Sequence, residues 1–228
     1  MAKRAARKSS ASPKNSVSAI QGLAIDSNHE PITKSVFDYR ETVVYPYLTS
    51  QGMVLTKLQG SLARRCYVVG ESTQDGVQYI TGVGHGFEDT YTGDYGEPIF
   101  QVGHYEAEEV RGKIVHLLAC QAGRKLGPDF VKQGCLAFFG YDMDFTFPMN
   151  HNRAMFFECD SEIDKGFAEG LTAREVYERT IALFNETIAA FDAAGDIDNA
   201  SLLETNRDHL RCPSSGGKKW GDTSARLR

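Results

Sequence analysis

Two residues with reactive side chains follow two short apolar segments in the middle of the chain. His85 stands between two glycines after residues 77–83 (VQYITGV), and Cys120 follows residues 114–119 (IVHLLA). Apolar runs of this length, bounded by glycine or polar residues, are typical of buried strands. Because open α/β sheets bind ligands at the carboxyl ends of their strands, we expect the imidazole and the thiol to meet at one edge of a sheet.

A thiol beside an imidazole supplies the nucleophile and the proton donor that cleavage of a peptide bond needs. Cys120 precedes Gln-Ala-Gly and a predicted helix, and backbone N–H groups at such a turn can stabilise an oxyanion. Gly86 lets the backbone approach a substrate carbonyl closely, so its N–H is a second expected oxyanion donor, beside that of Cys120. A lone cysteine or histidine is more often a packing residue. The placement of both at strand ends is what favours a catalytic pair.

The remaining histidines and cysteines fit such a pair less well. His116 lies four residues before Cys120 on the same segment, roughly 13 Å away by the rise of a strand, and is interpreted as a packed sheet residue. His104 follows a predicted strand and is the one serious substitute for His85. Three cysteines are interpreted as structural, and two histidines lie in loops without a motif: Cys66, Cys135, Cys159, His151 and His209.

The composition is that of one α/β domain. The 228 residues are 41% hydrophobic and 24% charged, which suffices for a sizeable core. The net charge of -5 conceals an asymmetry, because residues 1–25 carry five Lys or Arg and no acid, which leaves 20 bases against 30 acids in the rest. An acidic body is not typical of a nucleic-acid binder. No run approaches the roughly 18 apolar residues of a membrane span, so no membrane partner is expected.

The five cysteines are scattered and include no CxxC pair. This pattern argues against a disulfide framework and a structural zinc site and favours a reducing compartment, so we expect a cytoplasmic protein. The sequence contains no Gly-rich phosphate loop, no dinucleotide fingerprint and no cluster with the spacing of metal ligands. We therefore expect neither a cofactor nor a metal.

Three regions are expected along the chain. Residues 1–25 are basic and are predicted to form a disordered tail. Their similarity in composition to organellar transit peptides is the less favoured interpretation. Residues 26–212 are predicted to form the folded domain, and residues 213–228, rich in Gly, Ser and basic residues, a flexible C-terminal tail.

The hydrophobic pattern predicts strands that alternate with helices. Strands are expected at residues 32–37, 53–58, 77–83, 114–119 and 135–141, and residues 99–103 are expected to form half of a small hairpin. Helices are expected at residues 39–50, 61–69, 126–133, 172–194 and 196–205. The clearest of these begins with the capping box of Thr172 and Glu175 and ends at Gly195. This alternation predicts a parallel sheet with right-handed crossovers.

The two motifs resemble those of a known family. Gly-His-Gly at 84–86, and HLLACQAG at 116–123 followed by a helix and AFFGY at 137–141, resemble the caspase-like cysteine peptidases of clan CD, and most of all their CHAT-type bacterial group. The resemblance implies a three-layer α/β/α sandwich with a mostly parallel central sheet. It also implies a dyad in which His85 is the imidazole and Cys120 the nucleophile, with an oxyanion hole of the Gly86 and Cys120 main-chain N–H groups.

The sequence departs from the caspase pattern, because ACQAG replaces the pentapeptide QACRG, so specificity for Asp is not expected. Asp142 and Asp144 follow the strand at 135–141, and four more acids lie in the loop after His85: Glu88, Asp89, Asp94 and Glu97. A cleft lined by one sign of charge attracts the opposite sign. We therefore expect Asp142 and Asp144 to bind an Arg or Lys before the scissile bond. The alternative is that these acids are ordinary solvated loop residues.

The favoured function is that of a cysteine endopeptidase acting on a protein or peptide substrate, with regulation by a partner protein or by the N-terminal tail. A catalytically silent scaffold in a multiprotein system is the alternative, because a fold does not dictate activity. The presence of both His85 and Cys120 argues against it. A thiol hydrolase or transferase acting on small molecules is a third possibility.

Overall fold

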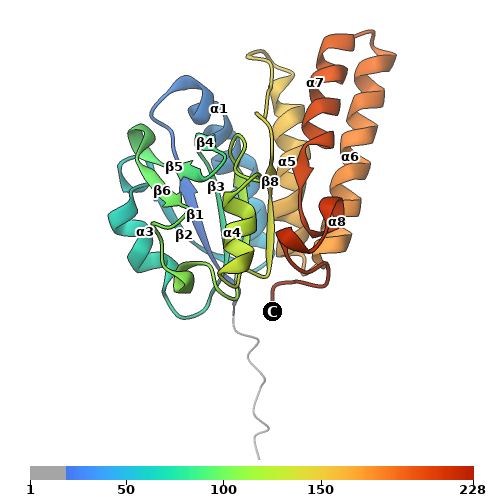
Figure 1. Ribbon diagram of the computed structural model, residues 1–228. Coiled ribbons are helices and arrows are strands. Elements are labelled where there is room, and N and C mark those ends of the chain that lie inside the picture. The colour runs from blue at the N-terminus through green and yellow to red at the C-terminus, as the bar shows by residue number, and fades with distance from the viewer. Residues whose placement is uncertain (1–18) are drawn as a thin grey trace, which may run out of the picture.

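The computed structural model describes residues 19–228, in which a six-stranded sheet carries helices on both faces (Figure 1). The strand order is β2-β1-β3-β7-β8-β9. All neighbouring strands are parallel except β9, which is antiparallel to β8. The strands are β1 (Gln21–Asp26), β2 (Val54–Gln59), β3 (Val77–Val83), β7 (Ile114–Leu118), β8 (Ala137–Tyr141) and β9 (Leu210–Arg211). Every residue of β7 and β8 is buried, which explains why their sequences are almost continuously apolar.

Two hydrophobic clusters lie on opposite faces of the sheet. One face is covered by α1 (Pro31–Tyr39), α2 (Tyr45–Ser50), α5 (Arg153–Ala168) and α6 (Ala173–Ala193), with α7 (Ile197–Asp208) packed on α6. The other face is covered by α3 (Arg65–Ser72), α4 (Leu126–Lys132) and a small antiparallel sheet. Its strands are β4 (Gly86–Phe87), β5 (Thr90–Thr92) and β6 (Pro98–Gln101). The predicted three-layer sandwich with a mostly parallel sheet is confirmed.

Short elements complete the fold. A π-helical turn at Arg40–Val44 joins α1 to α2, so the helix predicted at residues 39–50 is part of a longer helical segment. The other short helices are Gly60–Leu62, Asp94–Gly96, Ala107–Glu109, α8 (Pro213–Gly216) and Lys218–Trp220. The capping box of Thr172 and Glu175 is formed as predicted at the start of α6. None of the helices in residues 19–228 is long and apolar enough to cross a bilayer.

The N-terminal part of the described chain differs from the prediction. Residues 32–37, expected to be a strand, lie inside α1, which Glu30 caps and Pro31 begins. The first strand is instead β1, which lies between β2 and β3, so the sheet includes residues 21–25 of the predicted tail. Its apolar run, Leu23 to Ile25, has only three residues, which is too weak a pattern to predict a strand beside the basic segment. Residues 1–18 of that predicted tail lie outside the described residues.

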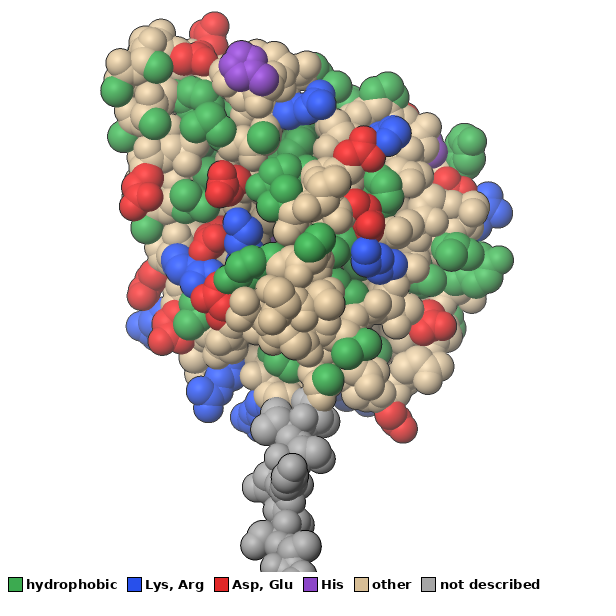
Figure 2. Space-filling model, turned by 180° about the vertical axis from the view of Figure 1, so that it is seen from behind, with side chains coloured by type: hydrophobic (Ala, Val, Ile, Leu, Met, Phe, Trp, Pro, Cys, Tyr) green, Lys and Arg blue, Asp and Glu red, His purple; other side chains and the backbone are tan. Residues whose placement is uncertain are grey.

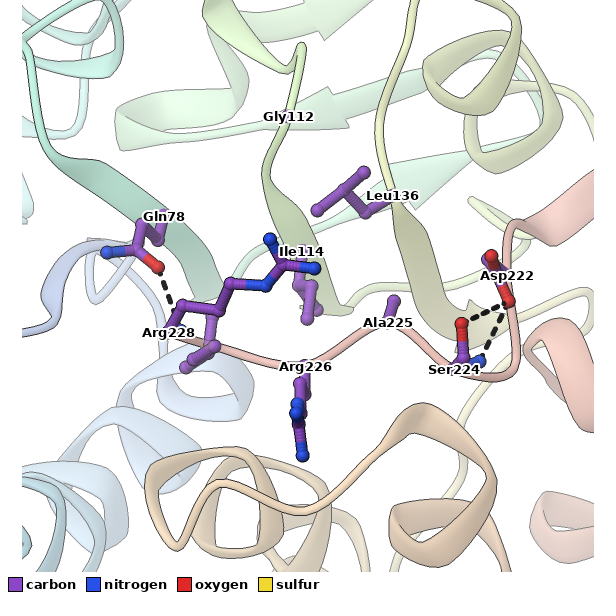
Figure 3. Close-up of a pocket in the computed structure, with 10 residues that line it drawn as sticks. Gln78, Gly112, Ile114, Leu136, Asp222, Ser224, Ala225, Arg226 and Arg228 are labelled. Atoms are coloured by element: carbon purple, nitrogen blue, oxygen red, sulfur yellow. Dashed lines mark hydrogen bonds between the residues drawn. The ribbon is translucent and has the colours of Figure 1, made fainter.

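The C-terminal residues 213–228 are packed on the domain, contrary to the expected flexible tail. Trp220 is 5% exposed and its indole N–H donates to the carbonyl oxygen of Gly123 at 2.8 Å. Ala225 and Leu227 are also buried, and the segment crosses the amino edge of the sheet beside Gln78 (Figure 3). Isolated apolar residues in a Gly/Ser-rich background are sufficient for this packing, but they give no periodic signal. The long helix α5 was not predicted.

A fully buried polar cluster lies between the sheet and α5. Arg40 contacts Asp164 at 3.0 Å and donates to Thr81 at 2.6 Å. His116 places Nδ1 3.1 Å from Asp164 and Nε2 3.2 Å from Asp160. Burial alone would lower the pKa of His116, but the carboxylates of Asp164 and Asp160 outweigh it and raise this pKa to about 9. The predicted packing role of His116 is therefore observed, and its imidazole is positively charged at neutral pH.

Charges of both signs are mixed on one face of the protein. On the face that Figure 2 shows, Lys and Arg side chains alternate with Asp and Glu, and hydrophobic side chains lie among them. Many of the surface charges form pairs, such as Lys34 with Asp38 and Lys57 with Glu41. Exposed pairs of this kind contribute little to stability, roughly 0–1 kcal/mol each.

Candidate active site

His85 and Cys120 lie just beyond the carboxyl ends of β3 and β7, which are adjacent and parallel. The register aligns the last residues of the two strands, Val83 with Leu118, so the two chains leave the sheet at the same level. His85 and Cys120 line one pocket of about 40 Å³. The structure thus brings the two predicted residues together at the predicted edge of the sheet.

The backbone of Gly86 lies directly against that of Cys120. A Cβ added to Gly86 would lie 2.2 Å from the carbonyl oxygen and 3.0 Å from the nitrogen of Cys120. No side chain fits there, so glycine is required by this close approach. The main chains of the two predicted oxyanion donors are therefore adjacent.

A sharp turn presents Cys120 to the pocket. Gln121 adopts a left-handed conformation with φ of 59°, which is uncommon for a residue with a side chain. Its N–H donates to the carbonyl oxygen of Met143 at 3.1 Å, and its side-chain amide donates to Asp144 at 2.8 Å. Gly123 N–H donates to the carbonyl oxygen of Tyr141 at 2.8 Å. These bonds to the segment after β8 hold the strained turn in place.

The thiol of Cys120 has a raised pKa. Burial is the largest cause, and the carboxylate of Asp144 raises the pKa further, whereas the N–H of Phe145 acts in the opposite direction. The free thiol is therefore protonated at neutral pH. A nucleophilic role requires a base to remove this proton, and His85 lies in the same pocket.

His85 has a carboxylate neighbour that the sequence interpretation did not include. Nε2 of His85 lies 3.4 Å from Oε1 of Glu30, and the imidazole is 44% exposed. Glu30 caps α1 by accepting the N–H groups of Ile32 and Thr33, at 2.8 and 2.6 Å. Partial burial raises the pKa of Glu30, but these hydrogen bonds outweigh it and lower this pKa. The carboxylate is thus held ionised beside the imidazole. The pair Glu30-Pro31 marks a helix start, but nothing in it indicates contact with His85.

The segment that follows β8 is also held by a buried amide, that of Asn206. Asn206 of α7 is 1% exposed, accepts the N–H of Thr146 at 3.0 Å and donates to its carbonyl oxygen at 2.8 Å. This double hydrogen bond fixes the backbone beside Phe145, whose side chain lines the pocket. Asn206 lies 60 residues away in sequence, so no local pattern could identify it.

The two acids predicted to bind a basic substrate residue differ in their surroundings. Asp142 lies 2.8 Å from Nδ1 of His209 and 2.5 Å from Nε of Arg211, which attaches β9 to the end of β8. Its carboxylate is therefore engaged within the fold. Asp144 is exposed and accepts a hydrogen bond from the neutral amide of Gln121.

The acids of the loop after His85 are also engaged within the protein. Glu88 contacts Arg124 at 2.8 Å and Lys125 at 2.7 Å. Arg64 lies 3.5 Å from Asp94 and 3.6 Å from Glu97, and Asp89 accepts the hydroxyl of Thr90. These pairings are the reason that this loop does not present the unpaired acidic surface expected from its sequence.

The other residues considered from the sequence lie away from the pocket. His104 is exposed beyond β6 and is not among the residues that line the pocket of Cys120. Cys135 and Cys159 are buried, in keeping with a structural role, whereas Cys66 is exposed on α3. Within residues 19–228 no three His, Cys, Asp or Glu side chains are grouped as metal ligands.

No family model matches the sequence, and no curated protein matches it significantly. Among solved structures the fold is similar to that of the Arg-specific cysteine proteinase gingipain R, with a TM-score of 0.60. The chain has the caspase-like fold. The similarity extends over 92% of this chain and 48% of the gingipain chain, at 15% sequence identity. This chain therefore spans about half the length of that protein, and the likeness is one of fold.

Proposed function

We propose that the protein is a cysteine endopeptidase in which His85 and Cys120 form the catalytic dyad. The observation that carries the proposal is the pocket shared by the two residues at the carboxyl edge of a caspase-like sheet. A cysteine peptidase with this fold is known in gingipain R. In the reaction, His85 accepts the thiol proton as Sγ attacks the substrate carbonyl, and the N–H groups of Gly86 and Cys120 stabilise the oxyanion.

The imidazolium then donates its proton to the leaving amine as the peptide C–N bond breaks, which leaves a thioester on Cys120. Water, deprotonated by His85, attacks the thioester and releases the acid product and the thiol. Glu30 orients the imidazole and stabilises its charged form, because its ionised carboxylate lies 3.4 Å from Nε2. No cofactor is needed for either step.

Cleavage after Arg or Lys, the specificity expected from the sequence, would have to rely on Asp144. Of the two acids predicted for this role, Asp142 is paired with Arg211, whereas within residues 19–228 Asp144 contacts no basic side chain. Gingipain R is Arg-specific. A basic residue before the scissile bond would therefore depend on Asp144 rather than on the acidic loop after His85, whose carboxylates are engaged.

A silent scaffold is the second candidate function, favoured by the raised pKa of the Cys120 thiol. A regulatory protein partner fits either function. The five cysteines are all free, which agrees with the proposed cytoplasmic location.

Labelling with a peptidyl acyloxymethyl ketone tests the proposal, because such a probe forms a thioether with an activated catalytic thiol. We expect labelling of the purified protein and cleavage of a peptide library, both lost in Cys120→Ala. Cys66→Ala is the matched control, because it removes an exposed thiol on α3 and should leave both signals unchanged. Absence of labelling and of cleavage in the intact protein would favour the scaffold.

A further inference from the structure

The pocket shared by His85 and Cys120 has apolar walls. They come from α1, from the ends of β3 and β7 and from the segment after β8: Ile32, Val36, Val83, Leu118, Phe145 and Phe147. Among residues 19–228, Thr33 is the only side chain in the lining, apart from His85 and Cys120, that has a polar oxygen, nitrogen or sulfur atom. No Asp, Glu, Lys or Arg of the described chain lines this pocket.

We infer that this pocket binds an aliphatic side chain, that of the substrate residue directly before the scissile bond. The inference rests on the proposed function. In the attack on the peptide bond, Sγ of Cys120 bonds to the carbonyl carbon of that residue. Its side chain, two bonds from the reacting carbon, must then lie within a few ångströms of the thiol. The apolar pocket adjoins the thiol, because Cys120 is one of its lining residues.

The chemistry of the walls favours an aliphatic over a charged side chain. Transfer of an ionised group into apolar surroundings without a partner costs several kcal/mol. Asp144, the carboxylate that could pair with a basic group, is exposed, is held by Gln121 and is not part of the lining. A guanidinium or ammonium placed among these walls would therefore lose hydration, and the two nearest carboxylates, Asp144 beside the thiol and Glu30 beside His85, lie outside the lining.

The size of the pocket limits the side chain further. Its volume of about 40 Å³ exceeds the roughly 10–15 Å³ that one water molecule needs, so the pocket is small. Hydrogen bonds hold two of the walls in place, α1 and the segment after β8. Glu30 caps α1, and Asn206 holds the backbone of Thr146 between Phe145 and Phe147. The walls of this small pocket are thus held in place, which favours a compact aliphatic side chain over a larger group.

A set of acyloxymethyl ketone probes that differ only in the last residue tests the inference. We expect the Val and Leu probes to label Cys120 at least about tenfold faster than the Arg, Asp and Phe probes, the discrimination that an apolar pocket gives. Faster labelling by the Arg probe would overturn the inference and leave the proposed endopeptidase standing. Labelling by none of the probes would overturn the proposed function, and the inference with it.

A charge placed at the rim of the pocket sharpens the test. Ile32 is 49% exposed in the first turn of α1, where an acidic residue is compatible with the helix dipole. Ile32→Asp should lower the labelling rate by the Val probe about tenfold and shift the preference toward Arg. Ile197→Asp is the matched control, because Ile197 is an exposed isoleucine in the first turn of α7 and does not line the pocket. An unchanged ratio of Val to Arg labelling in Ile32→Asp would contradict the inference.

Discussion

Two histidines on adjacent strands of one sheet have opposite surroundings. His116, within β7, is fully buried, and each of its ring nitrogens lies within 3.2 Å of a carboxylate. His85, just beyond β3, is 44% exposed, and its one carboxylate neighbour within 4 Å, in the described part of the chain, is Glu30 at 3.4 Å. The first imidazole has no hydrogen-bonding capacity left, whereas the second is partly exposed to solvent.

The difference follows from position in the fold. A side chain in the middle of a buried strand faces a packed helix layer, where a charge must be paired to be tolerated. A side chain at the strand end faces solvent, where an unpaired polar atom costs little. Catalysis needs the second condition, because a general acid and base must change its partner during the reaction. The buried cluster around His116 therefore holds the sheet to α5, and the exposed edge is available for chemistry.

The largest expected effects come from exchanging each histidine for alanine. His85→Ala should reduce the rate of peptide cleavage by a factor of about 10⁴, as loss of a catalytic base does in other hydrolases, with little effect on stability. His116→Ala should lower the free energy of unfolding by about 3–5 kcal/mol, because Asp160 and Asp164 are left buried without their shared cation. Urea unfolding and peptide cleavage, measured on both variants, check the two expectations.

The contrast between the two histidines is wrong if His85→Ala keeps its activity or His116→Ala keeps its stability. A stable His85→Ala variant that retains full cleavage would remove His85 from the dyad and leave His104 as the substitute to examine. A His116→Ala variant as stable as the parent protein would show that the two carboxylates of the cluster do not need this imidazolium.

The sequence predicted the parts of this contrast that depend on local pattern. Apolar runs located β3, β7 and β8, and the placement of His85 and Cys120 at strand ends predicted their convergence. The position of His116 inside such a run was enough to predict a packed residue. The capping box predicted the start of α6 for the same reason, because both of its residues are neighbours in the chain.

The remainder depends on contacts between distant segments. Arg40 and Asp164 are 124 residues apart, and Thr146 and Asn206 are 60 apart, so neither pair leaves a local signal. Asp142 illustrates the opposite error. Its position at the sheet edge was predicted correctly, but its role was assigned from charge alone. The sequence does not show that Asp142 pairs with Arg211 of β9. Charge predicts a binding role only when the partners of each charge are known.

The stability of the fold should depend on pH because of the buried His116. The pKa of His116 is raised to about 9 from an ordinary value of 6.5, so its charged form stabilises the folded state. This stabilisation is complete below pH 6.5 and is lost as the pH rises through about 9. We expect the free energy of unfolding to fall by on the order of 1–3 kcal/mol between pH 6 and pH 9.

Urea unfolding across this pH range measures the effect, and His116→Gln is the control. Glutamine keeps an N–H donor near the carboxylates but does not titrate, so the decline between pH 6 and pH 9 should be smaller than in the parent protein. An equal decline in both proteins would assign the pH dependence to other groups and place the charge of His116 in doubt.

The smallest expected effect comes from removing the charge of Glu30, which lies beside His85 and not beside His116. Glu30→Gln keeps the length of the side chain and an oxygen that can cap α1, but it removes the negative charge 3.4 Å from Nε2 of His85. If the charge stabilises the imidazolium during proton transfer, kcat should fall about tenfold with KM nearly unchanged, because the loss acts in the transition state. Glu106→Gln is the matched control, because Glu106 also caps a helical turn but, among the described residues, does not pair with a histidine as Glu30 does. A Glu30→Gln variant that loses stability but keeps kcat would restrict Glu30 to capping. His85 and Cys120 would then act without help from a carboxylate. His85 would differ most from His116, whose two ring nitrogens both contact carboxylates.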